Sequence, residues 1–188
     1  MTGQDAANVV VRTPPTSRGV EISSEYASPR SNRSSNADFE IRVPRQFNVH
    51  IASMNATVHV ADVEGTFNGG IMGGKLLLTG LRGRVSIAAM AGDIRLERSE
   101  VGGTVTTMRG NVVLDDVIGD VNASSMNGRV ERRNVRASGP AREIRMATMS
   151  GAIDVGDAPG GATVSTMRGD VRIEAENGNV AIRKQPPP

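Results

Sequence analysis

The chain has 188 residues, carries no cysteine and no tryptophan, and has a formal net charge of +2 at pH 7. The absence of cysteine excludes disulfides, thiolate zinc sites, iron–sulfur clusters and a cysteine nucleophile. The four aromatic residues, Tyr26, Phe39, Phe47 and Phe67, all precede residue 68, so the remaining chain must build its core without aromatic bulk. No apolar run approaches the roughly 18 residues that a membrane-spanning helix needs.

Residues 1–48 lack the pattern of the rest of the chain and are expected to form an irregular N-terminal cap. Strand-like stretches occur at Val9–Arg12, Val20–Ser23 and Phe39–Val43. Between the last two, Ala27–Ala37 is rich in Ser, Asn, Arg and Pro, a composition typical of a mobile loop.

From residue 49 onward an internal repeat dominates the sequence. Seven methionines recur at spacings of 18, 18, 18, 18, 23 and 18 residues: Met54, Met72, Met90, Met108, Met126, Met149 and Met167. Glycines recur about every nine residues, so each 18-residue unit consists of two nine-residue halves. Each half has apolar residues at fixed positions after the glycine, as Gly110, Val112, Leu114 and Val117 illustrate.

This pattern predicts an all-β fold, a single-stranded parallel β-helix (β-solenoid) of seven to eight coils over residues 49–184. The alternation within each half has the period of a strand, and one coil can bury its apolar side chains only when neighbouring coils stack on it. We interpret the methionine column as part of the core. The inward ladder is expected to contain Val58, Leu76, Ile94, Val112, Val130, Ile153 and Val171.

Two irregularities interrupt the repeat. At Ser99–Gly103 the repeated glycine is out of register. Around Arg136–Pro140 five extra residues are inserted, and we expect them to form a loop. The coil that carries the insertion also has Arg132 at an apolar position. The repeat ends in a half-coil, Asn179–Lys184, and a proline-rich tail at residues 185–188, because proline cannot donate to a strand ladder.

Several of these residues resemble a known family. Phe39–Pro44 and Asn48–Ile51 look like the entry into a bacterial adhesin family of β-helix domains, a family of unknown function. The family's repeated unit, apolar-any-Thr-apolar-Ser-Gly-Asp-apolar, is similar to Val105–Val112, Met146–Ile153 and Val164–Val171. The coil length alone gives a weaker resemblance to bactofilins, which are polymerising β-helices.

The resemblance to the adhesin family implies a β-helical module that is exported or associated with the cell envelope and has no established enzyme activity. The first residues, Met1–Asp5, carry neither a basic start nor an apolar stretch, so they do not form a secretory leader. The expected localisation is therefore the envelope if a leader has been removed, and the cytoplasm otherwise.

A pair of carboxylates is the sharpest candidate for catalysis. Glu97 and Asp115 each stand seven residues after a repeat methionine, which predicts neighbouring positions on adjacent coils about 4.8 Å apart. That separation is near the roughly 5–5.5 Å of retaining glycosidases. No aromatic residue is available there to stack a sugar, and Arg133 follows in the same column. We therefore interpret the two carboxylates as solvated surface residues beside an arginine.

Metal binding is not expected. His50 and His59 are predicted to point outward, and two histidines do not make a zinc site. Asp93, Asp120 and Asp170 follow glycines irregularly, unlike the Gly-Gly-any-Gly-any-Asp runs of calcium-binding β-rolls. We predict no catalytic, cofactor-binding or metal-binding residues.

An arginine-rich segment around the insertion is the candidate for a partner or an anionic ligand. Arginine donates hydrogen bonds in pairs to phosphate and carboxylate groups, so the expected partners are an anionic envelope polymer, lipid headgroups or another protein. Nucleic acid is disfavoured because stacking aromatics are absent from this region. The candidate residues are Arg129, Arg132, Arg133, Arg136, Arg142 and Arg145.

The leading functional hypothesis is a non-enzymatic structural or adhesion-like module of the bacterial cell envelope. The alternatives are a self-assembling, bactofilin-like scaffold and, more weakly supported, an enzyme that acts on polysaccharides. The expected oligomeric state is a monomer or a homodimer that associates through the C-terminal face, where the terminal coil exposes strand edges.

Overall fold

The computed structural model describes residues 15–16, 19–20, 43–136, 143–156, 161–174 and 180–184. The chain divides into two compact units, Met1–Arg42 and Val43–Pro188. In the first unit, β1 (Pro15–Thr16) pairs with β2 (Gly19–Val20) in antiparallel fashion. The predicted strand Val9–Arg12, the predicted loop Ala27–Ala37 and most of the other two predicted N-terminal strands lie outside the described residues.

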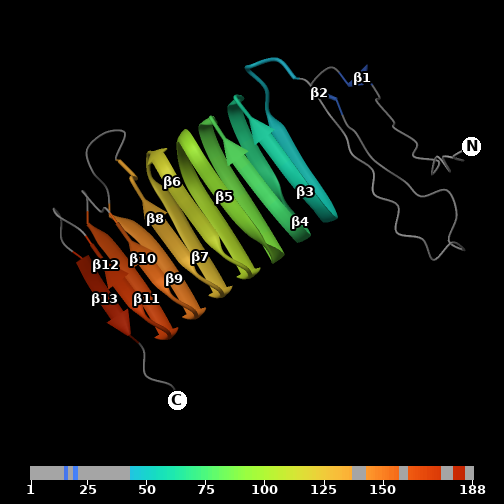
Figure 1. The fold of residues 1–188 in the computed structure, drawn as a ribbon. Helices are drawn as coiled ribbons and strands as arrows, with labels where there is room; N and C mark the ends of the chain where they lie inside the picture. The colour runs from blue at the N-terminus through green and yellow to red at the C-terminus, as the bar shows by residue number, and fades with distance from the viewer. Residues whose placement is uncertain are drawn as a thin grey trace, which may run out of the picture. The chain divides into compact units, whose positions relative to one another are not determined.

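The second unit is a parallel β-solenoid of about seven turns, which confirms the predicted fold class (Figure 1). Its strands stack as successive rungs, and every pairing among them is parallel. In the described part of the chain, no helix is long and apolar enough to cross a membrane. The strands are β3 (Val49–Ala61), β4 (Glu64–Thr79), β5 (Arg82–Arg109), β6 (Val112–Ile118), β7 (Val121–Asn127), β8 (Val130–Arg133), β9 (Ile144–Ser150), β10 (Ile153–Val155), β11 (Ala162–Arg168), β12 (Val171–Ile173) and β13 (Val180–Lys184).

The register of the strands follows the sequence repeat. Leu76 lies between Val58 and Ile94, each 18 residues away on an adjacent coil. Across the insertion the spacing is 23 residues, as in the pairing of Ala123 with Met146, and it then returns to 18. The solenoid therefore resumes its register, and residues 137–142, which include most of the insertion, lie outside the described residues.

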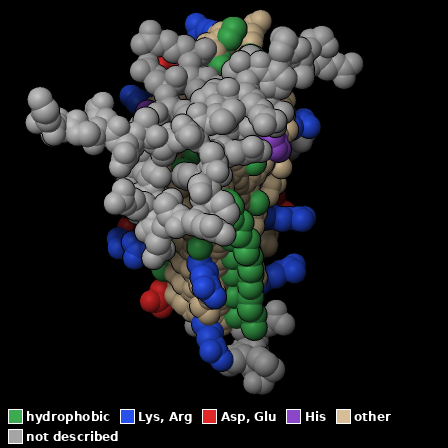
Figure 2. Space-filling view, turned by 90° about the vertical axis from the view of Figure 1, so that its right-hand side faces the viewer, with side chains coloured by type: hydrophobic (Ala, Val, Ile, Leu, Met, Phe, Trp, Pro, Cys, Tyr) green, Lys and Arg blue, Asp and Glu red, His purple; other side chains and the backbone are tan. Residues whose placement is uncertain are grey.

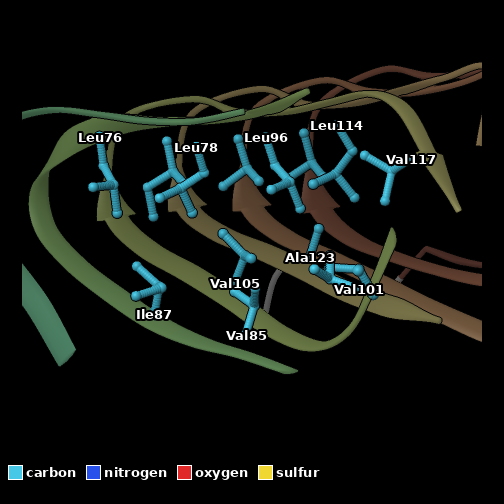
Figure 3. Packing of buried hydrophobic residues seen from close by; sticks show 14 of the residues in the cluster. Leu76, Leu78, Val85, Ile87, Leu96, Val101, Val105, Leu114, Val117 and Ala123 are labelled. Atoms are coloured by element: carbon cyan, nitrogen blue, oxygen red, sulfur yellow. The ribbon is translucent and has the colours of Figure 1, made fainter. Parts of the chain in front are cut away.

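Each coil has two walls that enclose the core. Wall A consists of β7, β9, β11 and β13, and wall B consists of β6, β8, β10 and β12, while β3, β4 and β5 run through both. Leu78, Leu96 and Leu114 of wall B face Val85 and Val105 of wall A across the interior (Figure 3). All five side chains are fully buried, so branched aliphatic residues fill the space between the walls.

The predicted inward ladder is confirmed. Its five central members are completely buried, whereas the first and last members, Val58 and Val171, are half-buried at the ends of the stack. The central members are Leu76, Ile94, Val112, Val130 and Ile153.

The interpretation of the methionine column as part of the core is wrong. Met54 is 74% exposed and Met126 40% exposed, and the intervening methionines and Met149 fall between these values. Only Met167 is half-buried. The column therefore lies on the outer surface of wall A.

The reason is a difference in backbone conformation between the two halves of a coil. In wall B, residues such as Asp116 and Asn134 adopt a left-handed conformation, with φ of 51° and 50°. This turn breaks the alternation of the strand, so the next residue, Val117 or Val135, points inward. Wall A has no such turn before the methionine, so alternation continues and buries the preceding residue instead.

In three coils that preceding residue is a buried serine or threonine whose hydroxyl bonds to the glycine bend of the coil before it. Thr107 is completely buried and donates to the carbonyl of Gly92 at 3.1 Å. Ser125 donates in the same way to the carbonyl of Gly110 at 2.9 Å. Thr148 donates likewise to the carbonyl of Gly128 at 3.3 Å, whereas the buried hydroxyl of Thr166 makes no such bond.

Gly110 is required at its bend. Its φ is +143°, and an added Cβ would lie 2.3 Å from the carbonyl oxygen of Gly92 on the preceding coil. No side chain fits such a close approach of two backbones.

The out-of-phase segment at Ser99 is accommodated inside β5. Ser99 is buried, accepts a hydrogen bond from the Leu81 amide at 3.0 Å and donates to the Glu97 carbonyl at 2.6 Å. A small polar residue fits this inward position because both of these bonds are made.

Candidate functional site

The outer face of wall B is strongly charged. Of its 21 outward positions, 12 carry a charged residue. Many of these charges pair with one another along a strand, as in the ion pairs Arg95–Glu97 and Arg133–Glu131. Arg172 donates to Glu174 at 2.9 Å, and this hydrogen bond, with the charge of Glu174, raises the pKa of Arg172.

Glu97 and Asp115 occupy adjacent coils, as the sequence predicts. Their backbones are direct partners in the parallel pairing of β5 and β6, and Arg133 follows Asp115 in the same column. Arg95 donates to Glu97, and Asn134 donates to Asp115 at 3.5 Å. Each carboxylate thus has its own polar neighbour on the outer face of wall B.

The aspartates considered for calcium lie apart. Asp93 accepts hydrogen bonds from the Asn111 backbone amide at 2.8 Å and from its side-chain amide at 3.2 Å, which links two coils at the bend. Asp120 is half-buried and Asp170 is exposed, on other coils. Among the described residues, no group of three or more His, Asp or Glu side chains could hold a metal ion.

The two histidines point outward, as predicted, but from different walls. His50 is exposed on wall A, where its Nδ1 lies 2.5 Å from the Asn68 side-chain oxygen of the next coil. His59 is exposed on wall B.

The six candidate arginines do not form one surface. Arg129, Arg133 and Arg136 are exposed along the wall B side of a single coil, with Arg133 paired to Glu131. Arg145 is exposed on wall A, and Arg142 lies outside the described residues.

Arg132 is buried, with only 2% of its surface exposed. It lies in the inward column of wall B, between Leu114 on one side and Val155 on the other. Its guanidinium therefore contributes to the interior of the solenoid and is not available on the outer surface.

The sequence interpretation did not identify one surface, the outer face of wall A. Over the seven methionine-bearing coils its 21 outward positions include a single charged residue, Arg145, against 12 on wall B. Arg183, on the terminal strand β13, is exposed beside Ser165 at the end of this face. Figure 2 shows a continuous column of hydrophobic side chains running along the molecule with basic side chains on both sides. The exposed methionines, one on each of the first six coils, form such a column. Counting charges separately for each outward column of the repeat would have revealed this face.

A comparison of the chain with protein-family models finds no matching family. Comparisons with curated proteins and with solved structures find no match either.

Proposed function

We propose that the chain is a non-enzymatic structural or adhesion-like module of the bacterial cell envelope. The observation that supports this proposal is the use of polar side chains along the coils. Asp93 and Asn111 each accept a hydrogen bond from the adjacent coil, and Glu97 accepts one from Arg95 on its own strand. These groups therefore stabilise a rod with repeating surfaces. Rods of stacked coils commonly serve as extended binding surfaces.

An anionic partner is proposed for the surface near the insertion, formed by Arg129, Arg133 and Arg136. All three are exposed on one coil, and arginine suits phosphate and carboxylate recognition. The partner is an anionic envelope polymer, anionic lipid headgroups or an acidic protein surface.

Sedimentation of the protein with vesicles that contain anionic lipid, and with an acidic polysaccharide, tests this partner. Binding should weaken as salt is added, because exposed charges are screened. The double variant Arg133→Glu/Arg136→Glu should lose binding, whereas Arg84→Glu/Arg109→Glu, which changes the net charge equally, should retain it. Equal binding by the first variant and the wild type would contradict the proposal.

A polysaccharide-acting enzyme is the weaker alternative, and it depends on the juxtaposed Glu97 and Asp115. Incubation of the protein with a panel of glycans should release no products. A product whose formation is lost in Glu97→Gln would reverse the ranking of the two functions.

A self-assembling scaffold is the second alternative, favoured by the terminal strand. Ile182 on β13 is 56% exposed, and β13 pairs only with β11 among the described strands. Association through this C-terminal face would give a homodimer. Light scattering over a concentration series tests this association. Ile182→Glu should abolish a dimer formed through the C-terminal face. Rods that grow with concentration would instead support a bactofilin-like scaffold.

The proposed location is the envelope, reached by export. Fractionation of cells that express the complete gene product tests this location. Recovery of the protein in the cytoplasmic fraction alone would contradict it.

A further inference from the structure

Three outward columns of wall A form a face along the solenoid that has one charged residue in its seven coils. Each column has one residue from each of the seven coils. The methionine column comprises Met54, Met72, Met90, Met108, Met126, Met149 and Met167. The small-residue column comprises Ala52, Gly70, Ala88, Thr106, Ser124, Ala147 and Ser165, and the polar column comprises His50, Asn68, Ser86, Thr104, Asn122, Arg145 and Thr163.

We infer that this face binds a second copy of the same chain, with the two solenoids side by side and wall A against wall A. The methionines and the near absence of charge both support an interface. Methionine is enriched in protein interfaces, and charged residues are depleted from interface cores. The strongly charged wall B of the same molecule shows that this depletion is specific to one face.

The shape of this face is complementary to the same face on a second copy of the chain. Long methionine side chains form a ridge at one side, and the adjacent column contains only Ala, Gly, Ser and Thr. A two-fold axis parallel to the solenoid places the small-residue columns of the two copies against each other. The methionine ridge of each copy then covers the polar column of its partner. Such an isologous contact closes as a dimer.

This axis determines how the two copies are aligned. Rotation about an axis parallel to the solenoid keeps both copies running in the same direction, so each coil faces the same coil of the partner. An antiparallel dimer would instead place one methionine ridge on the other and leave the small-residue columns apart. The geometry therefore selects parallel solenoids in register.

The size of the face is sufficient for a specific dimer. Seven coils about 4.8 Å apart span roughly 34 Å, and the three columns span about 13 Å across the strands. With the sides of the ridge included, two copies would bury on the order of 1,200 Å², the lower end of specific interfaces. Arg145, the one charged residue within the seven coils, lies in the outermost of the three columns, where its head reaches the rim. Arg183 follows Ser165 on the terminal strand β13, at the end of the face.

Sedimentation equilibrium of the full chain from about 1 μM to 1 mM tests the association. We expect a reversible monomer–dimer equilibrium. Ala88→Glu and Ala88→Lys should each weaken dimerisation by about 100-fold or more, because like charges meet at the two-fold axis. An equimolar mixture of the two variants should restore a heterodimer. Thr57→Glu, an exposed position on wall B, should dimerise like the wild type.

Single cysteines in this cysteine-free chain test the alignment by disulfide formation. Ala52→Cys and Ser165→Cys, on the first and seventh coils, should each cross-link to themselves. A mixture of the two should form no mixed disulfide above the level of random collision, because the two residues would lie about 29 Å apart. Thr57→Cys should not cross-link.

Three results would overturn the inference of a wall A dimer. A wild-type chain that stays monomeric, assemblies that grow beyond the dimer, or a dimer unaffected by Ala88→Glu would overturn it. Mixed disulfides between Ala52→Cys and Ser165→Cys without self cross-linking would overturn the parallel alignment. Circular dichroism shows whether each variant is folded. If the charged variants do not fold, the cysteine variants provide the test.

Discussion

The Thr107 hydroxyl donates a hydrogen bond of 3.1 Å to the backbone carbonyl of Gly92, fifteen residues earlier, at the bend of the preceding coil. Thr107 is completely buried, so the bond forms where water cannot replace it. This relationship explains why a hydroxyl residue precedes the methionine in most coils. The hydroxyl supports the bend from inside while the methionine points outward.

Replacing Thr107 by valine should lower the free energy of unfolding by about 1–3 kcal/mol, because the Gly92 carbonyl would lose its buried donor. Thr107→Ser keeps the donor and should cost less. Urea denaturation measures both variants, with the exposed Thr57→Val on wall B as the matched control. Equal stability of Thr107→Val and the wild type would show that the hydroxyl bond contributes nothing.

Gly110 and Gly102 provide a second comparison, between a bend that excludes a side chain and a position that accepts one. Gly110→Ala should destabilise the fold by at least about 2 kcal/mol, because the new Cβ would meet the Gly92 carbonyl oxygen and φ is +143°. Gly102→Ala should change stability by no more than about 0.5 kcal/mol, since its nearest neighbour would be the Asp120 oxygen at 3.6 Å. Thermal unfolding followed by circular dichroism measures the difference, and similar losses in both variants would contradict the geometry.

The fold was predictable because the repeat carries both the coil length and the inward ladder. Val112 follows Gly110 by two residues, and this phase alone places it in the core, as the structure confirms. The repeat by itself could not place the methionines, because their orientation depends on backbone conformation. The sequence does contain a signal. Asp116 and Asn134 are residue types that tolerate the left-handed conformation, and they precede an inward residue in wall B only.

The candidate sites were less predictable than the fold. The juxtaposition of Glu97 and Asp115 followed directly from the repeat, because register determines neighbours along a column. The arginine group was defined by proximity in sequence, and the solenoid distributes it over two walls and the interior. Arg145 and Arg133 are close in the chain, yet a bend and an insertion separate them.

The inward ladder can be tested with adjacent residues that face opposite ways. Val112 is completely buried, whereas Val113 is half-buried on the outer face of wall B. Val112→Asp should destabilise the fold by more than about 4 kcal/mol, because a carboxylate would enter an apolar interior without a partner. Val113 lies between Arg95 and Glu131 on the outer face, so Val113→Asp should destabilise the fold less than Val112→Asp does. Chemical denaturation measures both variants, and a stable, folded Val112→Asp would contradict the described core.

Arg132 allows a test of whether its burial stabilises the solenoid. The same inward column contains Leu78, Leu96 and Leu114 on the preceding coils, and a leucine at position 132 would continue that series. Burying a guanidinium requires the loss of its hydration, and replacement of buried charged groups by apolar residues of similar volume is often neutral or stabilising by about 1–4 kcal/mol. Arg132→Leu should therefore unfold at a urea concentration equal to or higher than that of the wild type. Arg129→Leu, which replaces an exposed arginine on the same coil, serves as the control and should leave the midpoint almost unchanged. A loss of several kcal/mol in Arg132→Leu alone would show that the guanidinium makes an essential interaction inside the coil, and the residue would then belong to the structural framework of the insertion.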